Sequence, residues 1–117
     1  MTKSKMIQYY AKDSLELKTD ASGAGFWGIA LDNTMLTYFE VGPDSSFDRH
    51  CHESEQITMV IEGILFFEAE GKDFSVKEGD AIAIPSNIPH RVYTKDKHVK
   101  AVDAWSPVRS EYVTKKV

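Results

Sequence analysis

The sequence predicts an all-β fold. Short runs rich in β-branched and aromatic residues follow one another closely, and polar turns containing Gly or Pro separate them. No internal segment keeps a helical period of about 3.6 residues between recognisable caps. Because many short strands at close spacing are typical of antiparallel sandwiches and barrels, we expect such a fold, in one domain that spans residues 1–117.

The predicted strands follow one another along the chain. Residues 35–41 (MLTYFEV) are aromatic and β-branched, and residues 57–69 (ITMVIEGILFFEA) are apolar on both sides of a bend at Glu62-Gly63. The turn EGKD then predicts a hairpin into a strand at 74–76. Further short strands are predicted at 81–84, 92–94 and 99–105. Residues 9–17 are ambiguous between a short helix and coil.

One motif has a misleading pattern. Residues 23–28 (GAGFWG) match the G-x-G-x-x-G of dinucleotide-binding loops. That pattern binds a pyrophosphate only where a buried strand precedes it and a helix follows. Here the preceding residues are polar and another strand-like run follows, so we interpret the motif as a Gly-rich turn or a bulged strand.

Composition excludes several classes of function. The net charge of −4 offers no basic surface for nucleic acid or an anionic membrane. The longest apolar runs are far shorter than the ~20 residues of a transmembrane helix, and the N-terminus lacks the apolar run of a signal peptide. The single cysteine, Cys51, excludes an internal disulfide and fits a reducing compartment. We therefore expect a soluble, cytoplasmic protein.

The segment RHCHESEQ, residues 49–56, concentrates residue types that bind metals. Alternate side chains of a strand share a face, so His50 and His52 would converge while Cys51 points away. Two converging imidazoles can supply two ligands to a metal ion. On this motif alone, two exposed loop histidines are an equally simple interpretation. Cys51 is disfavoured as a nucleophile because alternation separates it from both histidines.

Another histidine follows in DAIAIPSNIPH, residues 80–90. Pro85 and Pro89 each fix one backbone dihedral angle, so this loop presents His90 from a defined position. Taken alone, a Pro-His pair more often marks a stiffened loop than a ligand site. The remaining histidine, His98, lies in the charged turn KDKH and is interpreted as solvated.

Together these residues resemble the two motifs of the cupin superfamily, over about residues 35–105. The matching positions are Gly42, His50, His52, Gln56, Gly63, Gly79, Pro85 and His90. The chain departs from the usual pattern in the distance of the first Gly from H-x-H and in having Gln where Glu is commonest. The resemblance implies a double-stranded β-helix, the cupin jelly-roll barrel. Its metal ion would be bound by His50, His52, Gln56 and His90.

The fourth ligand decides the charge of this site. Spacing to His52 and Gly63 favours Gln56, and Glu55 is the alternative. Neutral imidazoles and a neutral amide leave the full charge of a divalent ion, which favours Lewis-acid chemistry such as isomerisation, enolisation or hydration. Oxygen chemistry is not excluded. The donor set suits Zn, Ni, Fe, Mn or Co, and the sequence does not distinguish them.

Residues 102–109 (VDAWSPVR) form a third cluster. On a strand, Asp103 and Trp105 would share a face, and the Ser-Pro turn could fold Arg109 back over the barrel mouth. An edge strand with a core Trp and a solvated Arg is the alternative. The segment also resembles the D-x-[aromatic]-S-P-x-R signature of short cupins from pectin and alginate degradation, which convert 4,5-unsaturated monouronates to linear keto acids. Trp105 stands where that signature usually has Phe.

This resemblance implies metal-dependent ketonisation or ring opening of a small unsaturated sugar acid. Arg109 would bind the carboxylate of the substrate. Asp103 would act as general acid and base, and Trp105 would form an apolar wall. The alternatives are another cupin enzyme, such as an iron-dependent dioxygenase, a lyase or a cyclase, and a binding protein without turnover.

The expected partners are the small carboxylate-bearing substrate and a second copy of the chain. Small cupins commonly pair as homodimers through their sheets, so the resemblance implies a homodimer. The apolar residues Ile57, Met59 and Ile61 alternate along one predicted strand. They could pack in the core or in that dimer interface.

Overall fold

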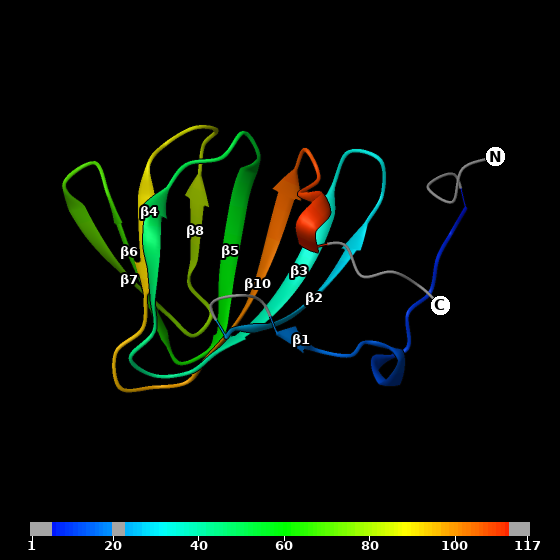
Figure 1. Cartoon of the computed structure of the whole chain (residues 1–117), viewed down its shortest axis with the longest axis horizontal. Coiled ribbons are helices and arrows are strands. Elements are labelled where there is room, and N and C mark those ends of the chain that lie inside the picture. The colour runs from blue at the N-terminus through cyan, green and yellow to red at the C-terminus, as the bar shows by residue number, and fades with distance from the viewer. Residues whose placement is uncertain (1–5, 20–22, 113–117) are drawn as a thin grey trace.

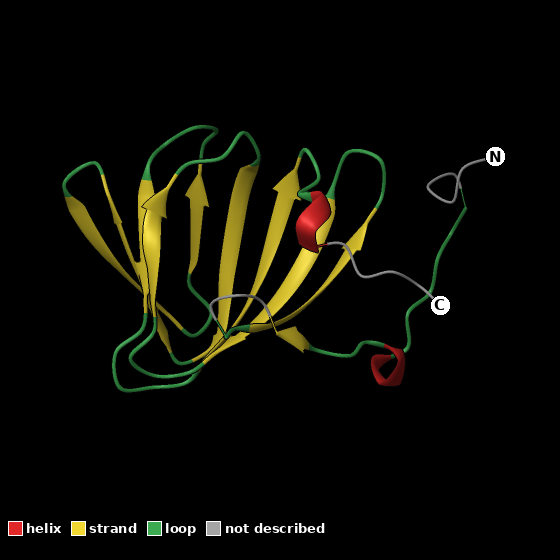
Figure 2. Cartoon of the chain, viewed as in Figure 1, coloured by secondary structure: helices red, strands yellow, loops and turns green. Residues whose placement is uncertain are grey.

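The computed structural model describes residues 6–19 and 23–112, and antiparallel strands in two sheets dominate it (Figure 1 and Figure 2). One sheet has six strands in the order β1-β2-β3-β10-β5-β8, and the other has four in the order β4-β9-β6-β7. Figure 1 shows the two sheets as the walls of one barrel, with the four-stranded sheet on the left. This arrangement confirms the predicted all-β fold and fits a double-stranded β-helix.

The strand bounds are as follows. The six-stranded sheet contains β1 Lys18–Thr19, β2 Gly25–Ala30, β3 Met35–Val41, β5 Glu55–Glu62, β8 Ala81–Ile84 and β10 Val99–Ser106. The four-stranded sheet contains β4 Ser46–His50, β6 Ile64–Ala69, β7 Lys72–Lys77 and β9 His90–Tyr93. Two short 3₁₀ turns are η2 Lys12–Ser14 and η3 Ser110–Tyr112.

Turn residues place most of these strands where the sequence predicts them. The apolar run 57–69 divides into β5 and β6 at Gly63, whose positive φ of 83° is a conformation that glycine adopts without strain. Between β6 and β7, Glu70 and Gly71 have φ values of 52° and 73°. Positive φ at both central residues is what a two-residue type I′ hairpin turn requires.

The structure resolves two segments that the sequence left ambiguous and shows strand β4, which the sequence did not predict. Strand β2 occupies most of the GAGFWG motif and is followed by β3, not by a helix, so this motif does not form a dinucleotide-binding loop. Strand β4 was not predicted because its residues are largely polar and exposed, without the alternation that marks a half-buried strand. The ambiguous segment 9–17 forms only the turn η2.

The apolar core lies between the two sheets. Its buried members come from both sheets: Val60, Leu65, Phe67, Val76, Ile84, Val99 and Ala101. Among the described residues, none forms a helix long and apolar enough to cross a membrane.

Strand β5 departs from the usual alternation of an amphipathic strand, in which apolar side chains face the core. Gln56 and Thr58 are buried inside the barrel, whereas Ile57, Met59 and Ile61 are 56%, 47% and 50% exposed. The outer face of this strand is therefore apolar and part of its inner face is polar. This reversal indicates that the interior near Gln56 is a site and not ordinary core.

Candidate metal centre

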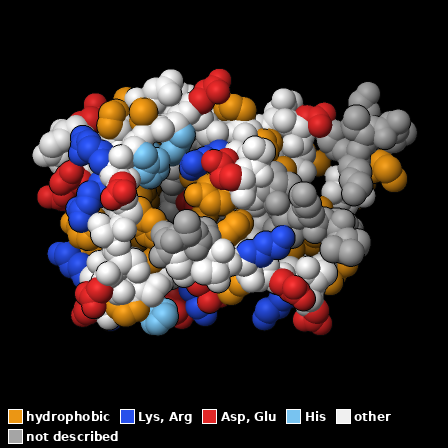
Figure 3. All heavy atoms as spheres, in the orientation of Figure 1, with side chains coloured by type: hydrophobic (Ala, Val, Ile, Leu, Met, Phe, Trp, Pro, Cys, Tyr) orange, Lys and Arg blue, Asp and Glu red, His pale blue; other side chains and the backbone are white. Residues whose placement is uncertain are grey.

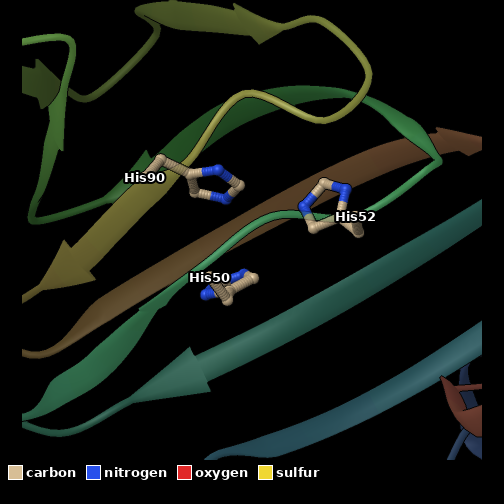
Figure 4. A group of neighbouring side chains, drawn as sticks. All are labelled: His50, His52 and His90. Carbon is tan, nitrogen blue, oxygen red and sulfur yellow. The ribbon is translucent and has the colours of Figure 1, made fainter.

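Three histidines converge between the two sheets. His50 ends β4 and His90 begins β9, and the two are cross-strand partners. One ligand nitrogen from each of His50, His52 and His90 lies within 4.8 Å of the others. Figure 4 shows the three rings around one common space. The ring centroids are 4.5 to 5.5 Å apart, so one ion could contact all three rings.

The turn after β4, not strand alternation, brings His52 to this place. Strand β4 ends at His50, and His52 lies in the connection to β5. The expectation that His50-Cys51-His52 is one continuous strand is therefore wrong, although the two histidines do converge. Cys51 is exposed on this turn.

Backbone carbonyls fix the orientation of all three rings. Nδ1 of His50 bonds the carbonyl oxygen of Asp48 at 2.8 Å, Nδ1 of His52 that of Ser54 at 2.8 Å, and Nδ1 of His90 that of Ile88 at 2.9 Å. Since a carbonyl can only accept, each Nδ1 carries the proton. Each Nε2 then keeps its lone pair, which is the tautomer that binds a metal through Nε2.

The surroundings also favour neutral rings. Burial lowers the pKa of His52 and of His90, although the backbone hydrogen bonds partly oppose this. The positive charge of Arg109 lowers both pKa values further. Neutral imidazoles at physiological pH are the form that can coordinate a cation.

Two buried polar atoms lack a hydrogen-bond partner among the described residues: His52 Nε2 and Gln56 Oε1. A buried acceptor without a partner is costly, and such atoms commonly mark an absent ion or water. The side chain of Gln56 also lies close to His52. This contact raises the pKa of His52, but burial lowers that pKa by more. Glu55, the alternative ligand, is exposed on the opposite face of β5. A histidine-rich set with one amide oxygen therefore fits a divalent transition metal.

A hydrogen-bond network fixes the amide of Gln56. Its Nε2 donates to Thr58 Oγ1 at 2.8 Å, and the Thr58 hydroxyl donates to Asp103 Oδ1. On the other side, Trp105 Nε1 donates to Thr37 Oγ1 at 2.8 Å, and that hydroxyl donates to Asp103 Oδ2 at 3.3 Å. Because the nitrogen of Gln56 donates to Thr58, its amide oxygen is the atom that is left without a partner.

Asp103 is wholly enclosed in the barrel. Burial raises its pKa to about 6, against the opposing effect of the hydrogen bonds from Thr58, Thr37 and Gln56. The charge of Arg109 also opposes the rise. A carboxyl group with a pKa in this range can both accept and release a proton near neutral pH.

The C-terminal segment places Arg109 at the cavity. Its guanidinium lies 5.0 Å from the ring centroids of both Trp105 and Tyr112, and Nη2 forms an ion pair with Glu111 at 3.3 Å. The Arg109 side chain is only 19% exposed, whereas that of Glu111 is 59% exposed. Arg109 thus folds back over the barrel interior, and its ionic partner Glu111 is solvent-exposed.

These groups share one cavity of about 120 Å³. Its polar and aromatic lining includes His50, Gln56, His90, Asp103, Trp105, Arg109 and Tyr112. Figure 3 shows histidine side chains at the edge of a hollow, with charged and apolar side chains also beside it. The structure therefore places Asp103, Trp105 and Arg109 in one cavity with His50 and His90.

Sequence reasoning missed Thr37, Thr58 and Tyr112. Thr58 is two residues after Gln56 on the same face of β5, which is a signal that could have been used. Thr37 is recognisable only from the pairing of β3 with β10, where it lies opposite Asp103. Tyr112 depends on the fold of η3, which packs its ring against Phe26 and Phe39.

The family of the chain follows from its sequence as a whole. A family model described as the cupin domain matches residues 37–105, more than half of the chain. The chain is a cupin. Known cupins with the same fold include the RmlC-like cupin of Shewanella frigidimarina, with a TM-score of 0.83 and 17% identity over 92% of this chain and 97% of that chain.

Two further solved structures share this cupin fold. KdgF from Halomonas has a TM-score of 0.81 and 22% identity, covering 89% of this chain and 98% of that chain. The polyketide cyclase RemF from Streptomyces resistomycificus has a TM-score of 0.76 and 24% identity, covering 89% of this chain and 81% of that chain. At these identities the likeness establishes the fold alone.

Curated proteins similar in sequence to this cupin are named acireductone dioxygenases. That of Tuber melanosporum is 32% identical in an alignment of 77 positions that covers 56% of this chain and 44% of that protein. That of Aspergillus fumigatus is 28% identical over 119 residues, covering 87% of this chain and 68% of that protein. The chain spans about half the length of most of these relatives.

Proposed function

We propose that this cupin is a metal-dependent enzyme that ketonises, or opens the ring of, a small unsaturated carboxylic acid. One observation carries the proposal. A cavity with a histidine cluster for one divalent ion also contains a buried carboxyl group with a pKa of about 6 and a guanidinium at its rim. The sugar acid implied by the tail signature, a 4,5-unsaturated uronate, is the reference substrate.

The proposed ligands of the ion are His50, His52, His90 and Gln56, because the cluster and its orphaned atoms face one space. A divalent ion bound there supplies a Lewis acid that polarises an oxygen of the substrate. The ligand set is tested by elemental analysis of the purified protein. Gln56→Ala should lower the metal content, and Glu55→Ala is the matched control on the exposed face.

The chain's own residues orient the substrate and move the proton. Arg109 binds the carboxylate of the substrate in place of Glu111, through a charge-assisted hydrogen bond. The indole of Trp105 forms a wall beside it. Asp103 takes the proton of the enol hydroxyl and supplies a proton to the enol carbon. The reaction is then an isomerisation without net oxidation.

The test is to incubate the metal-loaded protein with 4-deoxy-hex-4-enuronate and follow the absorbance of its conjugated alkene. We expect loss of absorbance well above the rate in buffer. Asp103→Asn should lower this rate about a hundredfold or more when it is compared with unaltered protein of the same metal content. A metal-loaded protein that does not accelerate the reaction would contradict the uronate as substrate.

The sequence relatives favour a second candidate, dioxygenase activity of the same site. Proteins named acireductone dioxygenase are 28–32% identical in alignments that cover 56% and 87% of this chain. Oxygen consumption by the Fe(II)-loaded protein with an acireductone distinguishes this activity from ketonisation, which consumes no oxygen. A third candidate is a binding cupin without turnover. It predicts no turnover in either assay, and it predicts that Asp103→Asn still binds the metal and the ligand.

We further propose that the outer face of the six-stranded sheet pairs two copies of the chain. Register aligns Leu36, Ala104, Ile57 and Ala83 in one row across four strands. The next row includes Val102, Met59 and Ala81. Lys100 and Glu62, 4.0 Å apart, border this face. An apolar face bordered by both charge signs can be self-complementary about a two-fold axis. Light scattering tests the dimer.

The cytoplasmic location stays a prediction.

A further inference from the structure

The proposed function defines the reacting end of the substrate and leaves its remaining part open. The cavity, however, extends past the metal-binding level. Along β10, Trp105 and Asp103 lie beside the histidines, and Ala101 and Val99 continue the same face further into the barrel. We call this deeper part the apolar chamber. It is lined by Val41, Leu65, Phe67, Val92, Val99 and Ala101.

The polar groups above the apolar chamber are already committed to one another. Asp103 accepts hydrogen bonds from Thr37 and Thr58. The Gln56 nitrogen donates to Thr58, and the Trp105 indole donates to Thr37. The histidine cluster and the Gln56 oxygen are the proposed ligands of the ion, and Arg109 lies at the rim. The side chains of the apolar chamber itself have no hydrogen-bonding group.

A hydroxylated chain would therefore fit this chamber poorly. Each hydroxyl buried there would lose its hydrogen bonds to water and gain none from the lining side chains, which is unfavourable. An apolar group would instead gain from leaving water. The cavity, with its polar level included, has a volume of about 120 Å³, so the apolar group that the chamber holds must be compact.

We propose that the apolar chamber binds a compact apolar substituent of the substrate, such as a phenyl ring or a short branched alkyl group. The substrate class is then an enolisable or unsaturated carboxylic acid with such a substituent, in preference to a polyhydroxylated acid. This inference rests on the proposed function for the acid head group, which Arg109 and the ion would bind. It assigns the specificity for the other end to the chamber.

The test compares three 2-hydroxy acids that share one head group: glycolate, 3-phenyllactate and gluconate. Calorimetric titration of the metal-loaded full chain gives the dissociation constant of each. We expect 3-phenyllactate to bind at least about tenfold more tightly than glycolate, from burial of its ring. Gluconate should bind no more tightly than glycolate. Gluconate binding more tightly than 3-phenyllactate would overturn the proposal.

Filling the chamber tests its location. Ala101→Ile extends a side chain into the chamber, and it should reduce the preference for 3-phenyllactate over glycolate about tenfold. Ala104→Ile, on the exposed face of the same strand, is the matched control and should keep the preference. Val99→Ile, a smaller addition, serves if Ala101→Ile fails to fold. An unchanged preference in both folded chamber variants would contradict the assignment.

This result is separable from the proposed function because it measures equilibrium binding. A protein that binds 3-phenyllactate with the expected preference but turns over no enol would refute the reaction and keep the chamber. A protein that ketonises the uronate while showing no preference for the aryl acid would refute the chamber alone.

Discussion

The amide of Gln56 shows how one side chain acquires a definite orientation from its neighbours. An amide presents either its oxygen or its nitrogen, and the choice here depends on Thr58, which accepts from the nitrogen at 2.8 Å. Thr58 is in turn held by Asp103. The carboxyl group of Asp103 thus serves the metal site even though it is not among the proposed ligands. Such outer contacts commonly determine metal affinity nearly as much as the ligands do.

The first prediction at this scale concerns Thr58. Thr58→Val keeps the shape of the side chain and removes the hydroxyl that joins Gln56 to Asp103. We expect metal affinity to fall about tenfold or more, because the amide loses its fixed orientation. Thr58→Ser restores the hydroxyl and should restore the affinity. Competition with a chromophoric chelator measures both, and an unchanged affinity in Thr58→Val would contradict the role of the network.

The second prediction concerns the pH dependence of stability in the metal-free protein. The folded-state pKa of Asp103, about 6, exceeds its ordinary value of 3.8. The folded protein therefore holds this proton more tightly than the unfolded chain. The resulting stabilisation is fully present below pH 3.8 and is lost as the pH rises through about 6.

Asp103→Asn removes this titration. The free energy of unfolding of the variant, relative to the unaltered protein, should rise by on the order of 2–3 kcal/mol between pH 4 and pH 7. Taking the difference between the two proteins cancels the titration of the histidines. Denaturant unfolding of both proteins across this pH range provides the measurement. A difference that is flat with pH would contradict the raised pKa.

At the scale of elements, strand β10 organises the interior. It pairs with β3 on one side and β5 on the other, and in that register Asp103 lies between Thr37 and Thr58. The C-terminal segment after β10 then folds back, and η3 brings Tyr112 onto Phe26 and Phe39. The site therefore depends on one long strand and on the turn that follows it.

The backbone of β2 lies very close to the backbone of η3. A Cβ at Gly28 in β2 would overlap the backbone oxygen of Tyr112. We expect Gly28→Ala to displace η3, to destabilise the protein by about 1–3 kcal/mol and to weaken carboxylate binding, because Arg109 moves with the segment. Thermal unfolding and ligand titration measure the two effects.

The control for this prediction is Gly25→Ala in the same strand. A Cβ there would meet Leu17 Cδ1 at 3.6 Å, which is an ordinary contact. Gly25→Ala should therefore leave carboxylate binding intact. Equal effects from the two substitutions would show that a general disturbance of β2, and not the contact between Gly28 and η3, is responsible.

The same elements show what the sequence predicts and what it does not. The strands at 35–41 and 81–84 were predictable because composition and turn residues mark both ends of each. The histidines were predictable from their spacing. The network of Thr37, Thr58 and Asp103 was not, because it depends on which strands are neighbours and in what register. The polar run of β4 carries no periodic signal at all.

At the scale of the whole molecule, the proposed ligands come from both sheets and the connection between them. His50 and His90 belong to the four-stranded sheet, and Gln56 belongs to the six-stranded sheet. An ion at the site would join the two walls of the barrel. Strand β5 carries Gln56 on its inner face and the apolar residues Ile57 and Met59 on its outer face. It therefore belongs both to the proposed metal site and to the proposed dimer interface.

The prediction at this scale concerns that outer face. Met59→Lys places a charge at its centre, and we expect the mass of the particle in light scattering to fall from two chains to one. Because Met59 is 47% exposed, the fold of each chain should be little affected. Ser75→Lys, on the exposed strand β7, is the control and should leave the mass unchanged. A monomeric unaltered protein would contradict the proposed interface.

The cavity also determines how the molecule should respond to hydrostatic pressure. Empty internal space disappears when a chain unfolds, so a barrel with a cavity of about 120 Å³ unfolds with a decrease in volume. Filling that space removes part of the decrease. A ligand in the cavity, or Ala101→Ile, should therefore raise the pressure at which the barrel unfolds.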